Sequence, residues 1–344
     1  MSDQWQWTDA RELCVEGKGW TDTKGPFERL PARAEGRVRD AVWRLSRHSV
    51  GVSIGFETDA TAVRARWTLA DPSVAAVSMS MLAANGLDFY IQTPRADWRW
   101  VGVTREIQGQ QAEASLTPWG ALSPGRKRCR AYLPLCNPVV ALEIGVPEGA
   151  TVEALPRRTE KPIAYYGTSI VHGIGVSRPG MSHVAILGRR LDYPILNLGF
   201  SSNALMEPEV ADLLAELDPV LYVLDALPNM GAALVDERAD AFVRRLTAAR
   251  PGTPLVLIED RTYPAGWVTP AVAADNRSRR AAFKRAFARL TAAGIGPLHY
   301  IEGDILLGTD GDGTIDGSHP NDLGAFRMAD AIEPLLRRLV GLPV

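Results

Sequence analysis

The chain has 344 residues, a length that suggests two domains, although one large domain is possible. Hydrophobic residues make up 46%, charged residues 23% and the formal net charge is −2, a balance that favours neither nucleic acid nor an anionic membrane surface as a partner. No run is apolar for long enough to span a membrane and residues 1–5 do not resemble a secretory signal, so we expect a cytoplasmic protein.

Residues 1–155 have the pattern of β structure. Apolar residues alternate with polar or small ones in short runs, and turn residues separate the runs. We therefore expect half-buried antiparallel strands that form a β-sandwich or jelly-roll domain. The clearest runs are Val52, Ile54 and Phe56; Val63, Ala65, Trp67 and Leu69; and Val140, Leu142, Ile144 and Val146.

The pattern changes near residue 156, where short apolar runs begin to alternate with helical spacings. Strands joined by helical crossovers form a parallel sheet that is covered on both faces. We therefore expect a second domain over residues 156–344. Its strands are predicted at 163–166, 195–198, 220–224, 255–258 and 298–301, with a crossover helix over 275–293 and a last helix over 322–339.

The cysteines Cys14, Cys129 and Cys136 lack the spacing of a zinc site, and three of them cannot all pair with one another. We expect them to be reduced and mostly buried. No catalytic zinc spacing occurs, and residues 310–316 place Ile315 and Asn321 where a calcium loop needs Gly and a carboxylate. The sequence therefore predicts neither a metal nor a cofactor.

Ser169 is the first candidate for chemistry. It follows the apolar run 163–166 and Gly167, which permits a sharp turn at the end of a buried strand. Open α/β sheets bind ligands at that edge. A serine there could equally be a simple helix N-cap. Val171 stands where the second Gly of a Gly-x-Ser-x-Gly elbow would be, which counts against an α/β-hydrolase fold.

Asp316 and His319 are the second candidate, three residues apart near the end of the chain. An aspartate can orient an imidazole, which can remove the proton of a serine hydroxyl so that the oxygen attacks a carbonyl. The simpler interpretation of His319 is a polar surface histidine before Pro320. Only the folded chain can bring this pair to Ser169.

Four blocks in this order resemble those of the SGNH (GDSL-like) hydrolase superfamily: Gly167–Ser169, Gly199, Asn229 and Asp316–His319. The resemblance implies a flavodoxin-like five-stranded parallel sheet with a catalytic triad. Ser169 would be the nucleophile, His319 the base and Asp316 its partner.

The same resemblance implies an oxyanion hole. Its donors would be the backbone N–H groups of Ser169 and Gly199 and the side-chain amide of Asn229, which are suitable for a tetrahedral oxyanion. The third block departs from the usual Gly-x-Asn-Asp, since it reads Leu-Pro-Asn-Met. If Asn229 points elsewhere, Asn203 or Ser201 would be the replacement donor.

Residues 86–90, Gly-Leu-Asp-Phe-Tyr, are similar to the Gly-x-Asp-Leu-Tyr signature of the β domain that precedes one SGNH subfamily. Residues 177–181 and 313–316 also look typical of that subfamily, so the resemblance covers most of the chain. We expect His172, Arg178 and Met181 to lie near the substrate. His172 is three residues beyond Ser169, although a histidine there is more often structural.

The sequence therefore predicts a metal-independent serine esterase. The resemblance implies small acyl esters, with acetyl esters of a sugar or oligosaccharide as the best candidates. The same residues could support acyl transfer, thioester cleavage or N-deacetylation. The alternative is a glycan-binding protein whose hydrolase-like half is inactive. The nine tryptophans could stack on sugar rings, but we expect most of them in the β core.

Overall fold

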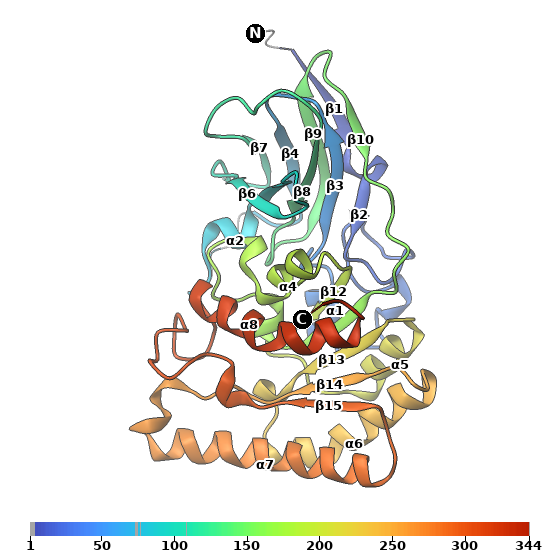
Figure 1. Ribbon diagram of the computed structural model, residues 1–344, viewed down its shortest axis with the longest axis vertical. Helices are drawn as coiled ribbons and strands as arrows, with labels where there is room; N and C mark the ends of the chain where they lie inside the picture. The colour runs from blue at the N-terminus through green and yellow to red at the C-terminus, as the bar shows by residue number, and fades with distance from the viewer. Residues whose placement is uncertain (1–3, 73–74, 76, 108, 344) are drawn as a thin grey trace. The chain divides into compact units, whose positions relative to one another are not determined.

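The computed structural model describes residues 4–343 apart from 73, 74, 76 and 108. The chain forms two compact units, seen in Figure 1. The first unit comprises Met1–Ala32, Ser46–Thr159 and Val176–Gly180, and the second comprises Arg33–Leu45, Glu160–Gly175 and Met181–Val344. The predicted boundary near residue 155 falls between the last strand of the antiparallel sheets and the first strand of the parallel sheet.

The first unit contains two antiparallel sheets and a short helix, α2 (Met81–Asn85). One buried cluster, which includes Ile54, Phe56, Trp67, Phe89 and Leu142, draws side chains from both sheets. One sheet has the order β1 (Trp5–Asp9), β9 (Val139–Pro147), β4 (Arg64–Leu69), β7 (Gln111–Ser115). The other has the order β10 (Val152–Ala154), β3 (Ser53–Thr58), β8 (Lys127–Tyr132), β5 (Asp88–Gln92), β6 (Trp98–Val103), with β2 (Cys14–Glu16) also beside β3.

Strand β4 shows how alternating apolar and polar residues place their side chains on opposite faces of a sheet. Ala65, Trp67 and Leu69 are buried, and Arg66 on the opposite face makes an ion pair with Glu143 of β9. One face therefore contributes apolar area to the core while the other stays in water. The expected all-β domain is confirmed.

Strand β9 departs from the predicted alternation at its start. Val140 is 51% exposed, whereas Leu142, Ile144 and Val146 are buried as predicted. The register against β4 shifts here, because Leu69 pairs with Val139 and Thr68 with Ala141. Val140 is the extra residue of a β-bulge, which turns its side chain away from the core.

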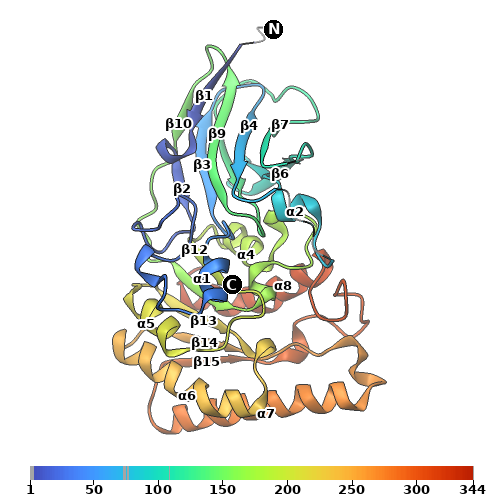
Figure 2. The same cartoon turned by 180° about the vertical axis from the view of Figure 1, so that it is seen from behind.

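The second unit is built on a five-stranded parallel sheet, as predicted. The strand order is β12 (Ile195–Gly199), β11 (Ile163–Gly167), β13 (Leu221–Asp225), β14 (Leu255–Ile258), β15 (Leu298–Ile301). This is the 2-1-3-4-5 order of flavodoxin-like folds. Figures 1 and 2 show α4 (His183–Leu191) and α8 (Asp322–Leu339) on one face of the sheet, and α6 (Ala232–Ala249) and α7 (Pro270–Ala292) on the other.

Helix α5 (Pro208–Glu216) packs beside α6. The segment 33–45, which contains most of α1 (Asp40–Ser46), also belongs to this unit, and Arg39 pairs there with Glu207. Because helices cover both faces, strands β11 and β13 are buried along their whole length, which explains their apolar sequences.

The cysteines are free thiols, of which Cys14 and Cys129 are buried. Burial raises the pKa of both Cys129 and Cys136 to about 12, so neither is a ready nucleophile at neutral pH. In the part of the chain that the structure describes, no helix combines the length and apolar character needed to cross a bilayer.

Candidate active site

Ser169 lies at the carboxyl edge of the parallel sheet. Strand β11 ends at Gly167, Thr168 caps the next helix through its hydroxyl, and Ser169 is the first residue of that helix, α3 (Ser169–His172). The serine is therefore an early helical residue rather than the N-cap. It is only 6% exposed. A strand–turn–helix connection at this edge fixes the hydroxyl where α/β sheets bind ligands.

The loop that carries Asp316 and His319 meets Ser169. His319 Nε2 lies 3.0 Å from Ser169 Oγ, and His319 Nδ1 lies 2.7 Å from Asp316 Oδ2. With the Nδ1 proton directed at the carboxylate, Nε2 is free to accept the proton of the serine hydroxyl. The structure thus brings the three residues singled out from the sequence into one continuous chain of hydrogen bonds.

Asp316 also holds its own loop. Its Oδ1 accepts hydrogen bonds from the backbone N–H groups of Ser318 (2.9 Å) and His319 (2.8 Å). Short Asp side chains favour such local turns. The backbone N–H of Ile315 donates to the carbonyl of His319 at 2.9 Å and closes the turn. One carboxylate therefore both shapes the loop and orients the imidazole.

Gly175 packs against the same loop from the chain segment that follows α3. Its φ is +103°, and a Cβ placed there would lie 2.4 Å from the carbonyl oxygen of Pro320 and 3.2 Å from Cβ of His319. Only glycine combines this backbone conformation with so close an approach. Gly175 thus confines His319 on one side.

Arg261 is a component of this site that the sequence did not suggest. It follows β14, is 2% exposed, and donates from Nε (3.1 Å) and Nη2 (2.8 Å) to the carbonyl oxygen of Ser318. Its Nη2 also donates to Ser318 Oγ at 2.7 Å. Ser318 directly precedes His319, so a buried guanidinium anchors the loop that carries the imidazole.

Asp260 is fully buried and makes an ion pair with Arg261. Its second oxygen accepts from the side-chain amide of Asn276 at 3.2 Å and from Arg279 at 3.4 Å. The sequence signal for this network was the charged run 259–261 directly after an apolar strand. Charge at the end of a buried strand is costly unless it is paired, and therefore points to a site.

Asp225, the last residue of β13, is a second group that the sequence did not suggest. It lies opposite Gly167 in the sheet and is 2% exposed. Its Oδ2 is buried without a hydrogen-bond partner. Burial raises the pKa of Asp225 to about 7, so this carboxyl group, close to the end of β11, is partly protonated at neutral pH.

The expected oxyanion-hole residues come from three adjacent strands. Ser169 follows β11, Gly199 ends β12, and Asn229 ends the short 3₁₀ helix after β13, Leu227–Asn229. A Cβ on Gly199 would lie 2.3 Å from the backbone nitrogen of His172, so only glycine lets α3 lie so close to β12. The Gly199 N–H donates to Asn197 Oδ1 at 3.0 Å in this structure.

The Asn229 side chain is half-buried, and its Oδ1 has no hydrogen-bond partner. Of the two proposed replacement donors, Asn203 and Ser201, Asn203 is engaged elsewhere. Its Nδ2 donates to the carbonyl of Ser201 at 2.7 Å and its Oδ1 accepts from Arg39 at 2.8 Å. Asn229 Oδ1 can accept but not donate, so the donor to an oxyanion would be its Nδ2, whereas one Nδ2 proton of Asn203 is already used for the Ser201 carbonyl.

The three residues expected near the substrate have different surroundings. His172 is 1% exposed, and its Nδ1 lies 3.2 Å from the carbonyl oxygen of Gly199. Arg178 belongs to the first unit, where it makes an ion pair with Asp88. Met181 is buried just before α4.

Asp310, at the start of the calcium-like stretch, makes an ion pair with Arg327 at 2.7 Å. Within the described residues, no group of three or more His, Cys, Asp or Glu side chains is arranged to hold a metal ion.

Comparison with known proteins identifies the class. The sequence model of the GDSL-like lipase/acylhydrolase family matches residues 160–337, so the chain belongs to that family. A second model, for the N-terminus of esterases of the SGNH hydrolase type and named for the GxDLY motif, matches residues 5–152. The resemblance read from the sequence is thereby confirmed, and the chain is a hydrolase of the esterase/acylhydrolase class. No match was found among curated proteins.

Solved structures agree with this assignment. A protein of Bacteroides ovatus ATCC 8483 assigned to the GDSL-like lipases has 31% sequence identity and a TM-score of 0.93, with 99% of each chain covered. The salicylyl-acyltransferase SsfX3 of a tetracycline biosynthetic pathway has 20% identity, a TM-score of 0.78 and 100% coverage of both chains. A family two carbohydrate esterase from Cellvibrio japonicus has 14% identity, a TM-score of 0.61 and 98% coverage of both.

Proposed function

We propose that this chain is a metal-independent serine esterase that removes small acyl groups, chiefly acetyl, from carbohydrate esters. The observation that carries the proposal is the hydrogen-bonded series from Ser169 Oγ through His319 to Asp316. A serine hydroxyl is a weak nucleophile until a base removes its proton, and an imidazole held by a carboxylate is a suitable base.

In the proposed reaction, Ser169 Oγ attacks the ester carbonyl carbon while its proton passes to His319 Nε2. The tetrahedral intermediate then collapses, and the imidazolium donates that proton to the departing alcohol. A water molecule next gives a proton to His319 and attacks the acyl carbon. The imidazolium then returns this proton to Ser169 Oγ as the acyl–oxygen bond breaks, which releases the acid and regenerates Ser169. Asp316 stabilises the imidazolium in both halves of the cycle.

The proposed oxyanion hole consists of the backbone N–H groups of Ser169 and Gly199 and the amide of Asn229. Its support is positional, since the three residues follow adjacent strand ends. The Gly199 N–H has to release Asn197 Oδ1 before it can donate to an oxyanion. Catalytic hydrogen bonds often tighten only in the reacting complex.

The carbohydrate part of the proposal extends what is known of proteins with the same fold. Family two carbohydrate esterases share this fold, and one, from Clostridium thermocellum, was solved with cellohexaose. We further propose that residues 156–344 form the catalytic domain and residues 1–155 an accessory β domain. A glycan-binding protein with an inactive hydrolase half is less well supported, because it has no need of the complete Ser–His–Asp series.

The test is hydrolysis of p-nitrophenyl acetate by the wild type and by Ser169→Ala in the presence of a metal chelator. We expect turnover by the wild type and a loss of at least about 10⁴-fold in the variant, the scale seen when a triad member is removed. Circular dichroism establishes that the variant is folded. Equal turnover by both proteins would show that Ser169 is not the nucleophile.

A further inference from the structure

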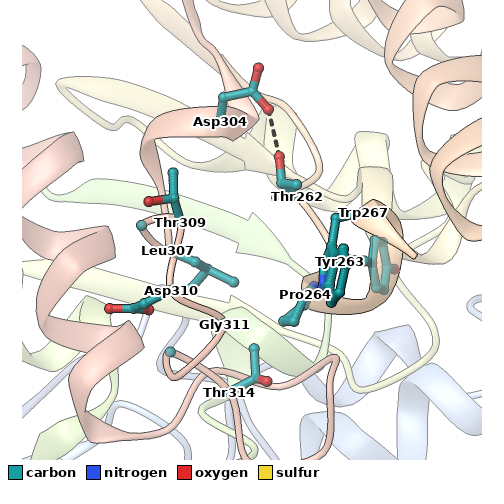
Figure 3. Close-up of a pocket in the computed structure, with 12 residues that line it drawn as sticks. Thr262, Tyr263, Pro264, Trp267, Asp304, Leu307, Thr309, Asp310, Gly311 and Thr314 are labelled. Atoms are coloured by element: carbon teal, nitrogen blue, oxygen red, sulfur yellow. Dashed lines mark hydrogen bonds between the residues drawn. The ribbon is translucent and has the colours of Figure 1, made fainter. Parts of the chain in front are cut away.

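A pocket of about 280 Å³ lies at the carboxyl edge of the parallel sheet, in the second unit. One wall is the segment after β14, residues 262–267, and the other is the loop after β15, residues 304–314. Figure 3 shows Tyr263, Pro264 and Trp267 grouped on one side and Leu307 on the other, with the Asp310 carboxylate directed away from the aromatic group. The volume suits a single small ring, since pockets for larger ligands begin near 300 Å³.

The first wall presents an exposed aromatic surface. Trp267 is 88% exposed although it lines the pocket. Neighbouring Tyr263 is held by Arg261, whose guanidinium carbon lies 4.3 Å from the ring centroid. An indole left in water keeps a large apolar face available for stacking against a ring. The wall therefore offers a flat surface for a ring.

The second wall supplies hydrogen-bond acceptors whose charge is already compensated. Asp304 accepts from Thr262 and from Arg280 at 2.7 Å. Asp310 pairs with Arg327, and this partner lowers the pKa of Asp310 to about 2. Both bonds of Asp304 go to Oδ1, so its Oδ2 keeps lone pairs for a hydroxyl group, while the paired arginines remove the need for a cationic ligand. A neutral, hydroxyl-rich molecule fits this combination.

Both walls are joined to the loop of the proposed base. Thr314 lines the pocket and lies two residues before Asp316, and the Gly317 N–H donates to its hydroxyl at 3.1 Å. On the other wall, Thr262 directly follows Arg261, which anchors Ser318. A ligand in the pocket would therefore contact residues that are bonded or adjacent to that loop.

We propose that this pocket binds one sugar ring of the acylated carbohydrate, with a C–H face of the ring stacked on Trp267 and a ring hydroxyl donating to Asp304. The inference rests on the proposed esterase function and adds the residues that recognise the alcohol part of the ester. An aromatic group that stacks on Trp267 is the competing occupant.

The test compares wild type, Trp267→Ala and Trp119→Ala on mono-acetylated glucose, xylose and galactose, on phenyl acetate and on ethyl acetate. Trp119 is 70% exposed but belongs to the first unit and does not line the pocket, so it controls for loss of a surface indole. We expect Trp267→Ala to lower the ratio of kcat/KM for the best sugar ester to that for ethyl acetate by roughly tenfold. Trp119→Ala should leave this ratio unchanged.

Calorimetric titration of the three acetylated sugars into Ser169→Ala, and into that variant with Trp267→Ala added, measures binding without turnover. Binding that weakens roughly tenfold without the indole supports the pocket even if Ser169 is not the nucleophile. The proposal is overturned if no acetylated sugar binds, or if the ratio is the same in wild type and Trp267→Ala. It is also overturned if Trp267→Ala weakens only the hydrolysis of phenyl acetate, because the occupant is then aromatic. If Ser169→Ala loses all turnover, the esterase proposal stands whether the pocket proposal is supported or overturned.

Discussion

At the scale of single residues, the proposed mechanism depends on groups with hydrogen-bonding capacity to spare. Asn229 would donate to the oxyanion through Nδ2, whereas Asn203 accepts from Arg39 and already donates to the Ser201 carbonyl. We expect Asn229→Ala to lower kcat for p-nitrophenyl acetate by about 10²–10³-fold with little change in KM, since an oxyanion donor acts mainly in the transition state. Asn203→Ala is the matched control. A larger kcat loss in Asn203→Ala would move the donor role to Asn203.

Asp225 gives a prediction about pH and stability. Burial raises its pKa from 3.8 to about 7, so folding favours the protonated form. The stability this contributes is fully present below pH 3.8 and is lost as pH rises through about 7. Asp225→Asn mimics the neutral group. The difference in unfolding free energy between this variant and the wild type should therefore depend on pH. We expect it to favour the variant by roughly 2 kcal/mol more at pH 8.5 than at pH 5.

Urea denaturation at the two pH values measures this difference. Asp330→Asn, which removes an exposed carboxylate of α8, controls for loss of a surface charge. The same change in unfolding free energy at both pH values would mean that Asp225 does not titrate between them.

At the scale of elements, the loop 316–319 is held by a neighbouring strand end. Arg261 after β14 donates three hydrogen bonds to Ser318, next to the imidazole. We expect Arg261→Met to lower kcat about 100-fold, because a displacement near 1 Å can cost that much, while KM changes little. Arg261→Lys should recover part of kcat, since an ammonium group can still donate to the Ser318 carbonyl.

The kinetic constants are compared with the urea midpoints of the same variants. A merely structural role would give losses of activity that follow unfolding alone, with no recovery of kcat in Arg261→Lys. That result would remove Arg261 from the list of positioning residues.

The elements of the parallel sheet could be predicted from the sequence, and the anchoring network could not. Strands β11 to β15 are short apolar runs because both faces of the sheet are covered, and this composition is a local signal. The bonds of Arg261 join residues 57 positions apart, and no local pattern carries that information. The predicted burial of Val140 was wrong for a related reason, since a β-bulge depends on the partner strand.

The candidate triad shows the same limit. Asp316 and His319 could be predicted as a pair from the sequence, because two residues three positions apart in one loop can share a turn. Their contact with Ser169, 150 positions away, was an inference from family resemblance. Trp267 was missed because its exposure and its pocket exist only once the segments after β14 and β15 lie side by side.

At the scale of the whole molecule, the chain crosses between the two units several times. Val176–Gly180 lies between α3 and α4 in the sequence yet packs within the first unit. Asp88, which has no exposed surface, holds it there by accepting from Arg178 Nη1 and from the Gly180 N–H, both at 2.8 Å. Asp88 belongs to the Gly-Leu-Asp-Phe-Tyr motif, so the motif has a structural task in this chain.

We expect Asp88→Ala to lower the free energy of unfolding of the full chain by about 3 kcal/mol, because it leaves a largely buried guanidinium without its carboxylate. Asp97→Ala is the control, since its side chain is 60% exposed and lies 3.9 Å from Arg99. Urea denaturation measures both variants. A change no larger in Asp88→Ala than in Asp97→Ala would show that the pair does not hold the segment.

The central claim is that Ser169 is a nucleophile activated by His319. The most direct measurement is labelling with a fluorophosphonate, followed by peptide mass spectrometry, in the wild type and in His319→Ala. We predict a covalent label on the peptide that contains Ser169 in the wild type, and a labelling rate at least about 10³-fold slower in His319→Ala. A label on a different residue, or an esterase activity that survives full modification of Ser169, would contradict the account.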